Sequence, residues 1–137
     1  MRLDRFLDEQ KDSYEIALKE IKAGRKKSHW MWYIFPQSAG LDYSSTAQYY
    51  AIKDLDEAIK YVNHPVLGKR LVEISETLLQ VDSNDAERVL GYPDNLKLRS
   101  SMTLFYFASG NDVFKKVIDK FFDGKMDQRT VDLLKMI

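Results

Sequence analysis

The apolar residues of this chain recur, in one segment after another, with the spacing of an α-helix. Near the C-terminal end they are Val113, Phe114, Val117, Ile118, Phe121 and Phe122. The same period runs from about Asp4 to Ala23. A stripe of this kind must be buried against another element. We therefore predict an all-α fold in which amphipathic helices share one core.

Residues that start and stop helices divide the chain into segments. Asp54 reads as an N-cap, with Glu57 completing a capping box, for a helix that runs to Val62. The other predicted helices lie at about 4–23, 46–53, 65–79, 85–90, 113–122 and 127–137. Four glycines follow predicted helices and read as C-caps, at Gly24, Gly91, Gly110 and Gly124. We expect a single compact domain over residues 1–137, with about seven to eight helices.

Two apolar segments stay open between helix and extended structure. The first is GRKKSHWMWYIFPQ, residues 24–37, which Pro36 interrupts. The second runs from Met102 to Phe107, where the composition suits a strand as well as a buried helix. Periodicity does not decide either case.

Composition excludes several classes of function. Lysine plus arginine number 21, as do aspartate plus glutamate, so no bulk charge attracts nucleic acid or an anionic membrane. There is no cysteine, which excludes thiol nucleophiles, disulfides and thiolate metal sites. No stretch approaches the ~18–20 apolar residues of a membrane span, and the first residues contain no secretory signal. We expect a cytoplasmic protein with no membrane contact, no metal and no cofactor.

The segment at 24–37 combines cations with aromatic rings. Arg25 and Lys26 lie close to Trp30 and Trp32, a combination that suits a planar anionic ligand such as a nucleotide. The alternative is that the cations complement a helix C-terminus and the rings fill the core. His29 is the candidate acid or base, although a structural role is the other interpretation.

Further polar residues flank apolar stretches. Gln37 can contact a ligand through an amide that both donates and accepts, or it can satisfy loop backbone groups. A second polar cluster comprises Lys97, Arg99, Ser100, Ser101 and Thr103. If residues 95–105 are helical, Lys97, Ser100 and Ser101 lie on adjacent faces and can bind an oxyanion, or they can form a solvated helix edge. His64 precedes Pro65, where a local capping role fits.

Four blocks of the sequence closely resemble one uncharacterised family. They are GRKKSHWMWYIFPQ, SSTAQYYAI, DEAIKYVNHPVLGKRL and GYPDNLKLRSSMTLF. The family is known as domain of unknown function 1810, and its members are sometimes labelled calpastatin. Asp42 departs from its pattern, in which a glycine is expected after Gly40 and Leu41. The resemblance implies an all-α fold and supplies no activity.

A second resemblance is to the NADAR family, enzymes similar to ADP-ribose glycosidases. SSTAQYYAIK is similar to that family's segment T-S-E-H-x-x-Q-A-x-K, and the positions that match are Ser45, Ala51 and Lys53. Gly68 and Arg70 lie near a second element of that family. Thr46, Ala47 and Tyr50 stand where that family has Glu, His and Gln. The resemblance implies a NADAR-like fold with a pocket for ADP-ribose, but without the same carboxylate chemistry.

These patterns lead to two hypotheses. The first is binding or processing of ADP-ribose or a nucleotide, with stacking by Trp30, Trp32 and Tyr50. His29 and Glu57 are then the candidate catalytic residues of a glycosidase-like hydrolase. The alternative is a non-enzymatic protein-interaction module, because no catalytic constellation is complete. Nucleic-acid binding ranks third, since the net charge is zero.

Overall fold

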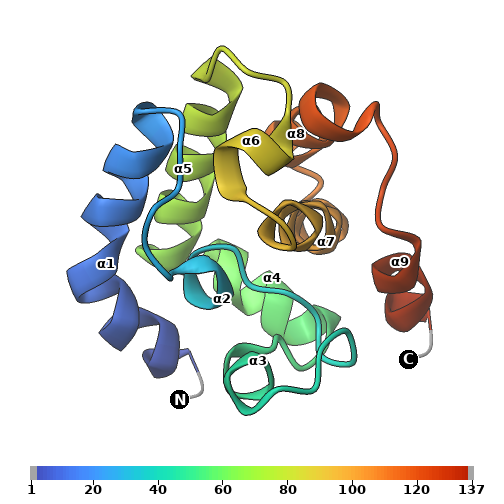
Figure 1. Ribbon diagram of the computed structural model, residues 1–137. Coiled ribbons are helices and arrows are strands. Elements are labelled where there is room, and N and C mark those ends of the chain that lie inside the picture. The colour runs from blue at the N-terminus through green and yellow to red at the C-terminus, as the bar shows by residue number, and fades with distance from the viewer. Residues whose placement is uncertain (1–2, 136–137) are drawn as a thin grey trace.

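Helices form all the regular secondary structure in the part of the chain that the computed structural model describes, residues 3–135 (Figure 1). That part contains nine helices and no strand. They are α1 (Asp4–Lys22), α2 (Met31–Ile34), α3 (Ser45–Tyr50), α4 (Leu55–Asn63), α5 (Leu67–Gln80), α6 (Ala86–Leu90), α7 (Asp94–Ser109), α8 (Asp112–Phe122) and α9 (Gln128–Lys135). The predicted all-α fold is confirmed. Both open segments contain helix, which brings the count above the seven to eight expected.

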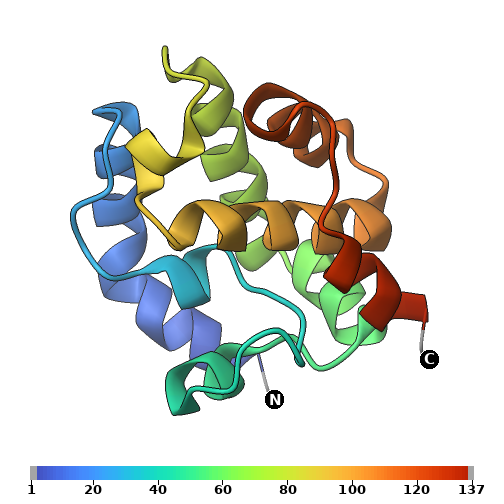
Figure 2. The ribbon, with the colours of Figure 1, turned by 45° about the vertical axis from the view of Figure 1, so that its right-hand side comes forward.

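Helix α7 runs through the middle of the molecule, end-on in Figure 1 and lengthwise in Figure 2. It contacts α4, α6, α8 and α9, while α1 packs on α5, and α5 in turn on α4 and α8. Leu98, Met102, Leu104 and Phe105 of α7 are all fully buried. A helix that is apolar on several sides shows no amphipathic period. This is why the sequence pattern of 102–107 did not distinguish a helix from a strand.

Local capping signals in the sequence are largely reproduced. The Asp54 carboxylate accepts a hydrogen bond from the Glu57 amide at 2.9 Å, as the capping pattern predicted. His64 Nδ1 accepts from the amides of Val66 and Leu67 at 3.1 and 3.2 Å, so the expected capping role is confirmed. The following helix begins at Leu67, two residues after Pro65.

The helix predicted over 46–53 is shorter at its C-terminal end, because the chain leaves α3 at Tyr50 for a main-chain contact. Ala51 is extended. Ile52 then donates its amide to the Gln37 carbonyl and accepts from the Ala39 amide, both at 2.8 Å. These two bonds close residues 39–51 into a loop that contains α3, and we call Gln37, Ala39 and Ile52 its base. Figure 2 shows this loop in teal below α7.

Arg5 holds the same loop from α1. Its Nε donates to the Tyr49 carbonyl and its guanidinium to the Ala51 carbonyl, both at 2.8 Å. Only 4% of the Arg5 side chain is exposed, and it forms an ion pair with Glu57 at 3.2 Å. The carbonyls at the end of α3, which lack intrahelical partners, are therefore satisfied by a buried cation.

Gly68 marks the closest approach of backbone to backbone in the first turn of α5. A Cβ at this position would lie 1.9 Å from the carbonyl oxygen of Val62. No side chain fits there, so close packing of α4 against α5 requires glycine at this position.

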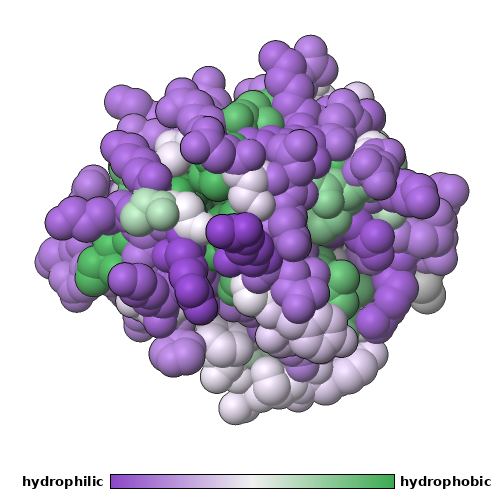
Figure 3. Space-filling model, turned by 45° about the horizontal axis from the view of Figure 1, so that its top comes forward, coloured by the Kyte–Doolittle hydropathy of each residue, from purple (hydrophilic) through white to green (hydrophobic). Residues whose placement is uncertain are grey.

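Some large apolar side chains are exposed on the surface. The large ones that are exposed are Ile16, Tyr43, Tyr49, Ile59, Val66, Tyr92, Leu96 and Phe107. Figure 3 shows a face of the molecule that is mostly hydrophilic, with small hydrophobic areas separated by polar side chains. Within the described residues, no helix combines the length and the hydropathy that crossing a bilayer requires.

Candidate functional site

A groove opens where the loop after Gln37, the first turns of α7 and the start of α9 meet. Its lining residues are Gln37, Leu41, Asp42, Pro93, Leu96, Lys97, Arg99, Ser100, Asp127 and Arg129. Its volume is about 390 Å³, within the range of small-molecule sites. Four residues that the sequence singled out come together here, Gln37, Lys97, Arg99 and Ser100.

Cations dominate the walls of the groove. Lys97, Arg99 and Arg129 line it, together with the carboxylates of Asp42 and Asp127. Lys97 is paired with Asp94 at 3.4 Å, a carboxylate that also holds a second lysine from the other side. Arg99 is 3.8 Å from Asp127, at the long end of an ion pair. The cations are therefore only partly neutralised, and charge-assisted hydrogen bonds from them would suit an oxyanion.

Asp127 lines the groove at the start of α9 and is held there by hydrogen bonds. Its Oδ2 accepts from the Ser100 hydroxyl at 3.0 Å, and from the hydroxyl and amide of Thr130 at 2.6 and 3.1 Å. Its amide donates to the Thr103 hydroxyl at 3.0 Å. Asp127 thus caps α9 and ties it to α7. Ser100 and Thr103, which belong to the polar cluster singled out in the sequence, are buried where these two helices meet, so they do not form a solvated edge, and Ser100 also lines the groove.

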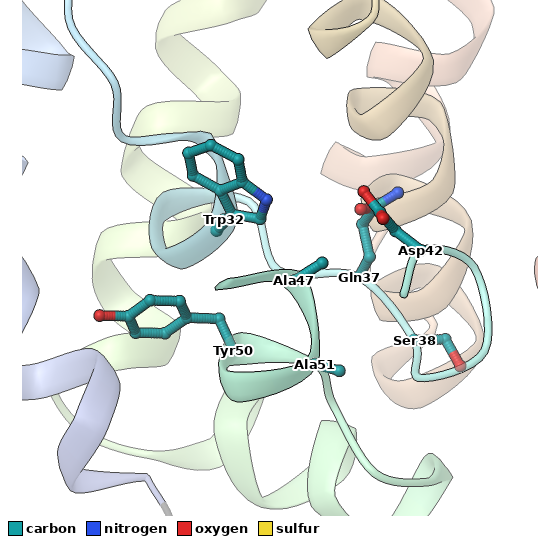
Figure 4. A pocket seen from close by; sticks show the side chains of 7 residues that line it. All are labelled: Trp32, Gln37, Ser38, Asp42, Ala47, Tyr50 and Ala51. Carbon is teal, nitrogen blue, oxygen red and sulfur yellow. The ribbon is translucent and has the colours of Figure 1, made fainter. Parts of the chain in front are cut away.

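A much smaller hollow adjoins the groove (Figure 4). It is lined by Trp32, Gln37, Ser38, Asp42, Ala47, Tyr50 and Ala51, and it shares Gln37 and Asp42 with the groove. Its volume of about 10 Å³ is room for one water-sized group. In Figure 4 the indole nitrogen of Trp32 is on the side where Gln37 and Asp42 lie, whereas the Tyr50 hydroxyl points away from them.

Trp32 carries an unsatisfied donor at this hollow. Its Nε1 is buried and has no hydrogen-bond partner among residues 3–135, and the same is true of Arg99 Nε. Leaving one such group unpaired costs about 1–3 kcal/mol. Trp32 lines the hollow and Arg99 lines the groove, so a water or a ligand would have polar partners to complete there.

Trp30, two residues earlier, belongs to the core instead. It is 1% exposed, and its Nε1 donates to Glu20 at 2.9 Å. The same carboxylate accepts from the amides of Lys27 and Ser28 and from the Ser28 hydroxyl. Partial burial would raise the pKa of Glu20, but these hydrogen bonds outweigh it and lower the pKa to about 2. The predicted stacking role does not suit a ring in this position.

The other predicted residues lie outside the groove. Arg25 and His29 are exposed and line neither the groove nor the small hollow. Lys26 is paired with Asp94 at 2.9 Å, and its ammonium lies 5.1 Å from the centroid of the Trp30 ring. Glu57 is occupied by Arg5 and by the Lys53 amide, at 3.2 and 2.9 Å. These contacts of Glu57 suit a structural role better than acid–base chemistry.

Ser101 and Tyr50, also predicted to bind a ligand, lie outside the groove. Ser101 is fully buried in α7, and its hydroxyl has no partner in the described part of the chain. Tyr50 lines the small hollow, and its ring packs 5.3 Å from Tyr33 and 4.8 Å from Tyr49, measured between centroids. The ring thus forms part of a tyrosine cluster rather than an open stacking platform.

Six groove residues were not among the predicted ones: Leu41, Asp42, Pro93, Leu96, Asp127 and Arg129. Asp127 had a usable signal, because an Asp before a predicted helix is an N-cap candidate. Arg129 is exposed, and its guanidinium donates to the Gly40 carbonyl at 3.4 Å. Nothing in the sequence shows that the last helix meets the loop after Gln37.

No cluster of three or more His, Cys, Asp or Glu side chains in residues 3–135 has the arrangement of a metal site. The chemistry that the groove itself offers is hydrogen bonding and charge.

Comparisons with known proteins agree with this fold. The family model described as "Protein of unknown function (DUF1810)" matches residues 1–134. Among solved structures, the chain is similar to a conserved hypothetical protein from Mycobacterium tuberculosis, with 44% sequence identity and a TM-score of 0.95. The match covers 97% of this chain and 96% of that one. No curated protein matches.

Proposed function

The chain belongs to the DUF1810 family of proteins of unknown function, and we propose that it binds a nucleotide-like small molecule, ADP-ribose or a nucleotide, in the groove. The observation that carries the proposal is the buried, unpartnered Nε1 of Trp32 beside a groove lined by Lys97, Arg99 and Arg129. A ligand that supplies both an anion and polar oxygens would satisfy all of these groups.

The phosphate end of the ligand is assigned to the cations. Arg99 and Arg129 approach the groove from α7 and α9 and can offer planar pairs of donors, which suit phosphate oxygens. Lys97 adds a point charge, since the second lysine on Asp94 already compensates much of that carboxylate. Binding through these groups should weaken as the salt concentration rises.

The remainder of the ligand has polar and apolar walls to contact. Leu96 is 43% exposed at the groove, and Pro93 is exposed beside it, so a base or sugar face can lie against them. Asp42 and Gln37 provide acceptors for sugar hydroxyls on the opposite wall. This division into a cationic end and a hydroxyl-accepting wall fits nucleotides and ADP-ribose alike.

Binding is the part of the prediction that the geometry supports best. Processing would need an acid or base at the reacting bond, and neither His29 nor Glu57 lines the groove. Asp127 Oδ2 already accepts three hydrogen bonds. We therefore propose a ligand-binding protein that acts in the cytoplasm, without assigning it turnover.

The test is a thermal-shift and calorimetry panel of ADP-ribose, NAD, AMP, ADP, ribose 5-phosphate and inorganic phosphate. A ligand at about 100 times its Kd stabilises the folded protein by about 2.7 kcal/mol, which is several degrees in Tm for a domain of this size. The variant Arg99→Gln should weaken binding at least about tenfold, because it removes a charge-assisted contact worth about 1.5–3 kcal/mol.

Arg25→Gln is the matched control, since it makes the same change at an exposed residue that lines neither hollow. The Tm of each variant without ligand shows whether it remains folded. Equal binding by wild type and Arg99→Gln would contradict the proposed site. No binding across the panel would favour the alternative, a protein-interaction module.

A further inference from the structure

We infer that the small hollow beside the groove holds one secondary hydroxyl of a ribose phosphate, at ribose C2 or C3, so that the ligand is recognised as a ribosyl and not a deoxyribosyl compound. The inference rests on the proposed function, because the phosphate must lie on the cations of the groove for the sugar to reach the hollow. It adds a specificity determinant that is separate from those cations.

The size of the hollow sets the first limit. About 10 Å³ accommodates a single oxygen-sized group and neither a ring nor a phosphate. Because Gln37 and Asp42 line both the hollow and the groove, a group in the hollow lies next to a ligand in the groove. Whatever is bound there is one substituent of a larger molecule, or a water.

The chemistry of the walls sets the second limit. Trp32 Nε1 is a donor without a partner in the described chain, so the group must accept a hydrogen bond. Asp42 offers a carboxylate on the same hollow, so the group should also donate one. A hydroxyl does both. A phosphate or carboxylate oxygen would be repelled by Asp42, and an ammonium has no lone pair for the indole N–H.

Contacts within the fold hold the residues that line the hollow in position. Gln37 belongs to the base of the loop, where its carbonyl accepts from Ile52 at 2.8 Å. Asp42 Oδ1 accepts from the Ser44 amide at 3.1 Å, which orients the carboxylate from its own loop. The Trp32 ring is covered by Lys97, whose ammonium lies 4.6 Å from its centroid. Lys97 therefore contacts both parts of the site: it lines the groove, where the phosphate would lie, and it packs on Trp32, which lines the hollow for the hydroxyl.

The experiment measures binding of ribose 5-phosphate, 2-deoxyribose 5-phosphate and 3-deoxyribose 5-phosphate by calorimetry. We expect wild type to bind one of the two deoxy compounds at least about tenfold more weakly than ribose 5-phosphate. In Trp32→Phe, which removes the indole N–H and keeps an aromatic ring, this ratio should fall severalfold, because only the Asp42 carboxylate still contacts the hydroxyl. The control Tyr49→Phe removes a polar group from an exposed ring that lines neither hollow, and it should keep the ratio.

Trp32→Phe should stay folded, because the N–H it removes has no partner in the described residues, and its Tm without ligand checks this. If wild type binds all three sugar phosphates alike, the hollow holds only a water and the inference is wrong. Discrimination that is as strong in Trp32→Phe as in wild type would also overturn it. Binding of ADP-ribose without ribose 5-phosphate overturns the inference and leaves the proposed function standing. Absence of binding by every compound, ADP-ribose included, overturns both.

Discussion

The ammonium of Lys97 lies 4.6 Å from the centroid of the Trp32 ring, so a cation of α7 rests on an aromatic ring of α2. These two residues belong to segments that are far apart in the sequence. Their contact forms one edge of the site, with the groove on the side of Lys97 and the small hollow on the side of Trp32. Lys97 is therefore placed to contribute both to stability and to anion binding.

Replacing Lys97 by Met should separate these two contributions. The loss of the cation–π contact should lower the free energy of unfolding by about 0.5–1 kcal/mol, because Asp94 keeps its other lysine. Affinity for ADP-ribose should fall about tenfold, since a charge on the phosphate is lost. Urea denaturation and calorimetry measure the two effects. Lys116→Met, at an exposed residue of α8 outside both hollows, should change neither.

Replacing Glu20 by Gln should destabilise the segment that leads into α2. The carboxylate accepts four hydrogen bonds from Lys27, Ser28 and Trp30, and an amide cannot accept on both of its terminal atoms. We expect a loss of about 2 kcal/mol in the free energy of unfolding. Equilibrium urea denaturation of this variant beside Glu76→Gln, an exposed position on α5, is the measurement. Equal midpoints for the two variants would contradict the prediction.

The same carboxyl predicts a dependence of stability on pH. The pKa of Glu20 is lowered from 4.5 to about 2 in the folded protein, so the unfolded chain takes up this proton first as pH falls. The stabilisation by Glu20 is thus complete above about pH 4.5 and is lost progressively towards pH 2. The difference in free energy of unfolding between wild type and Glu20→Gln should be constant from pH 7 to 5 and should shrink by pH 3. A difference that stays constant down to pH 3 would show that Glu20 does not titrate in this way.

Gly68→Ala should be among the most damaging single substitutions. Alanine normally favours a helix over glycine by about 1 kcal/mol, but here its Cβ would collide with the Val62 carbonyl at 1.9 Å. We expect a net loss of about 2 kcal/mol or more, measured as a shift in the urea midpoint. Lys69→Ala, at the exposed neighbouring residue, should have almost no effect. A Gly68→Ala protein as stable as wild type would mean that α4 and α5 can move apart at this point.

Features that depend on nearby residues could be predicted from the sequence, and features that depend on distant ones could not. The Asp54 cap and the amphipathic stripe of α8 are local, and both are found in the structure. Trp30 and Trp32 look equivalent in the sequence. They differ because Glu20, ten residues before Trp30, binds one indole and leaves the other to the hollow.

The candidate site shows the same limit. Lys97, Arg99 and Gln37 could be singled out as polar residues beside apolar segments, but their convergence requires the packing of the loop against α7. Arg129 gave no signal at all, because its place in the groove follows only from the contact between α9 and α7 that Asp127 makes. The ion pair of Glu57 could not be predicted, because its partner, Arg5, lies on another helix.

The hydrogen bonds of Ile52 to Gln37 and Ala39 form the base of the loop and separate the exposed part of the loop from the residues that line the site. Residues 42–46 are exposed beyond it. Insertions or exchanges there need not move Gln37, Trp32 or the cations of α7. Under the proposed function, changes in this surface loop would alter which sugar is accepted without moving the cations assigned to the phosphate. Grafting this loop between relatives would be a direct way to transfer ligand preference.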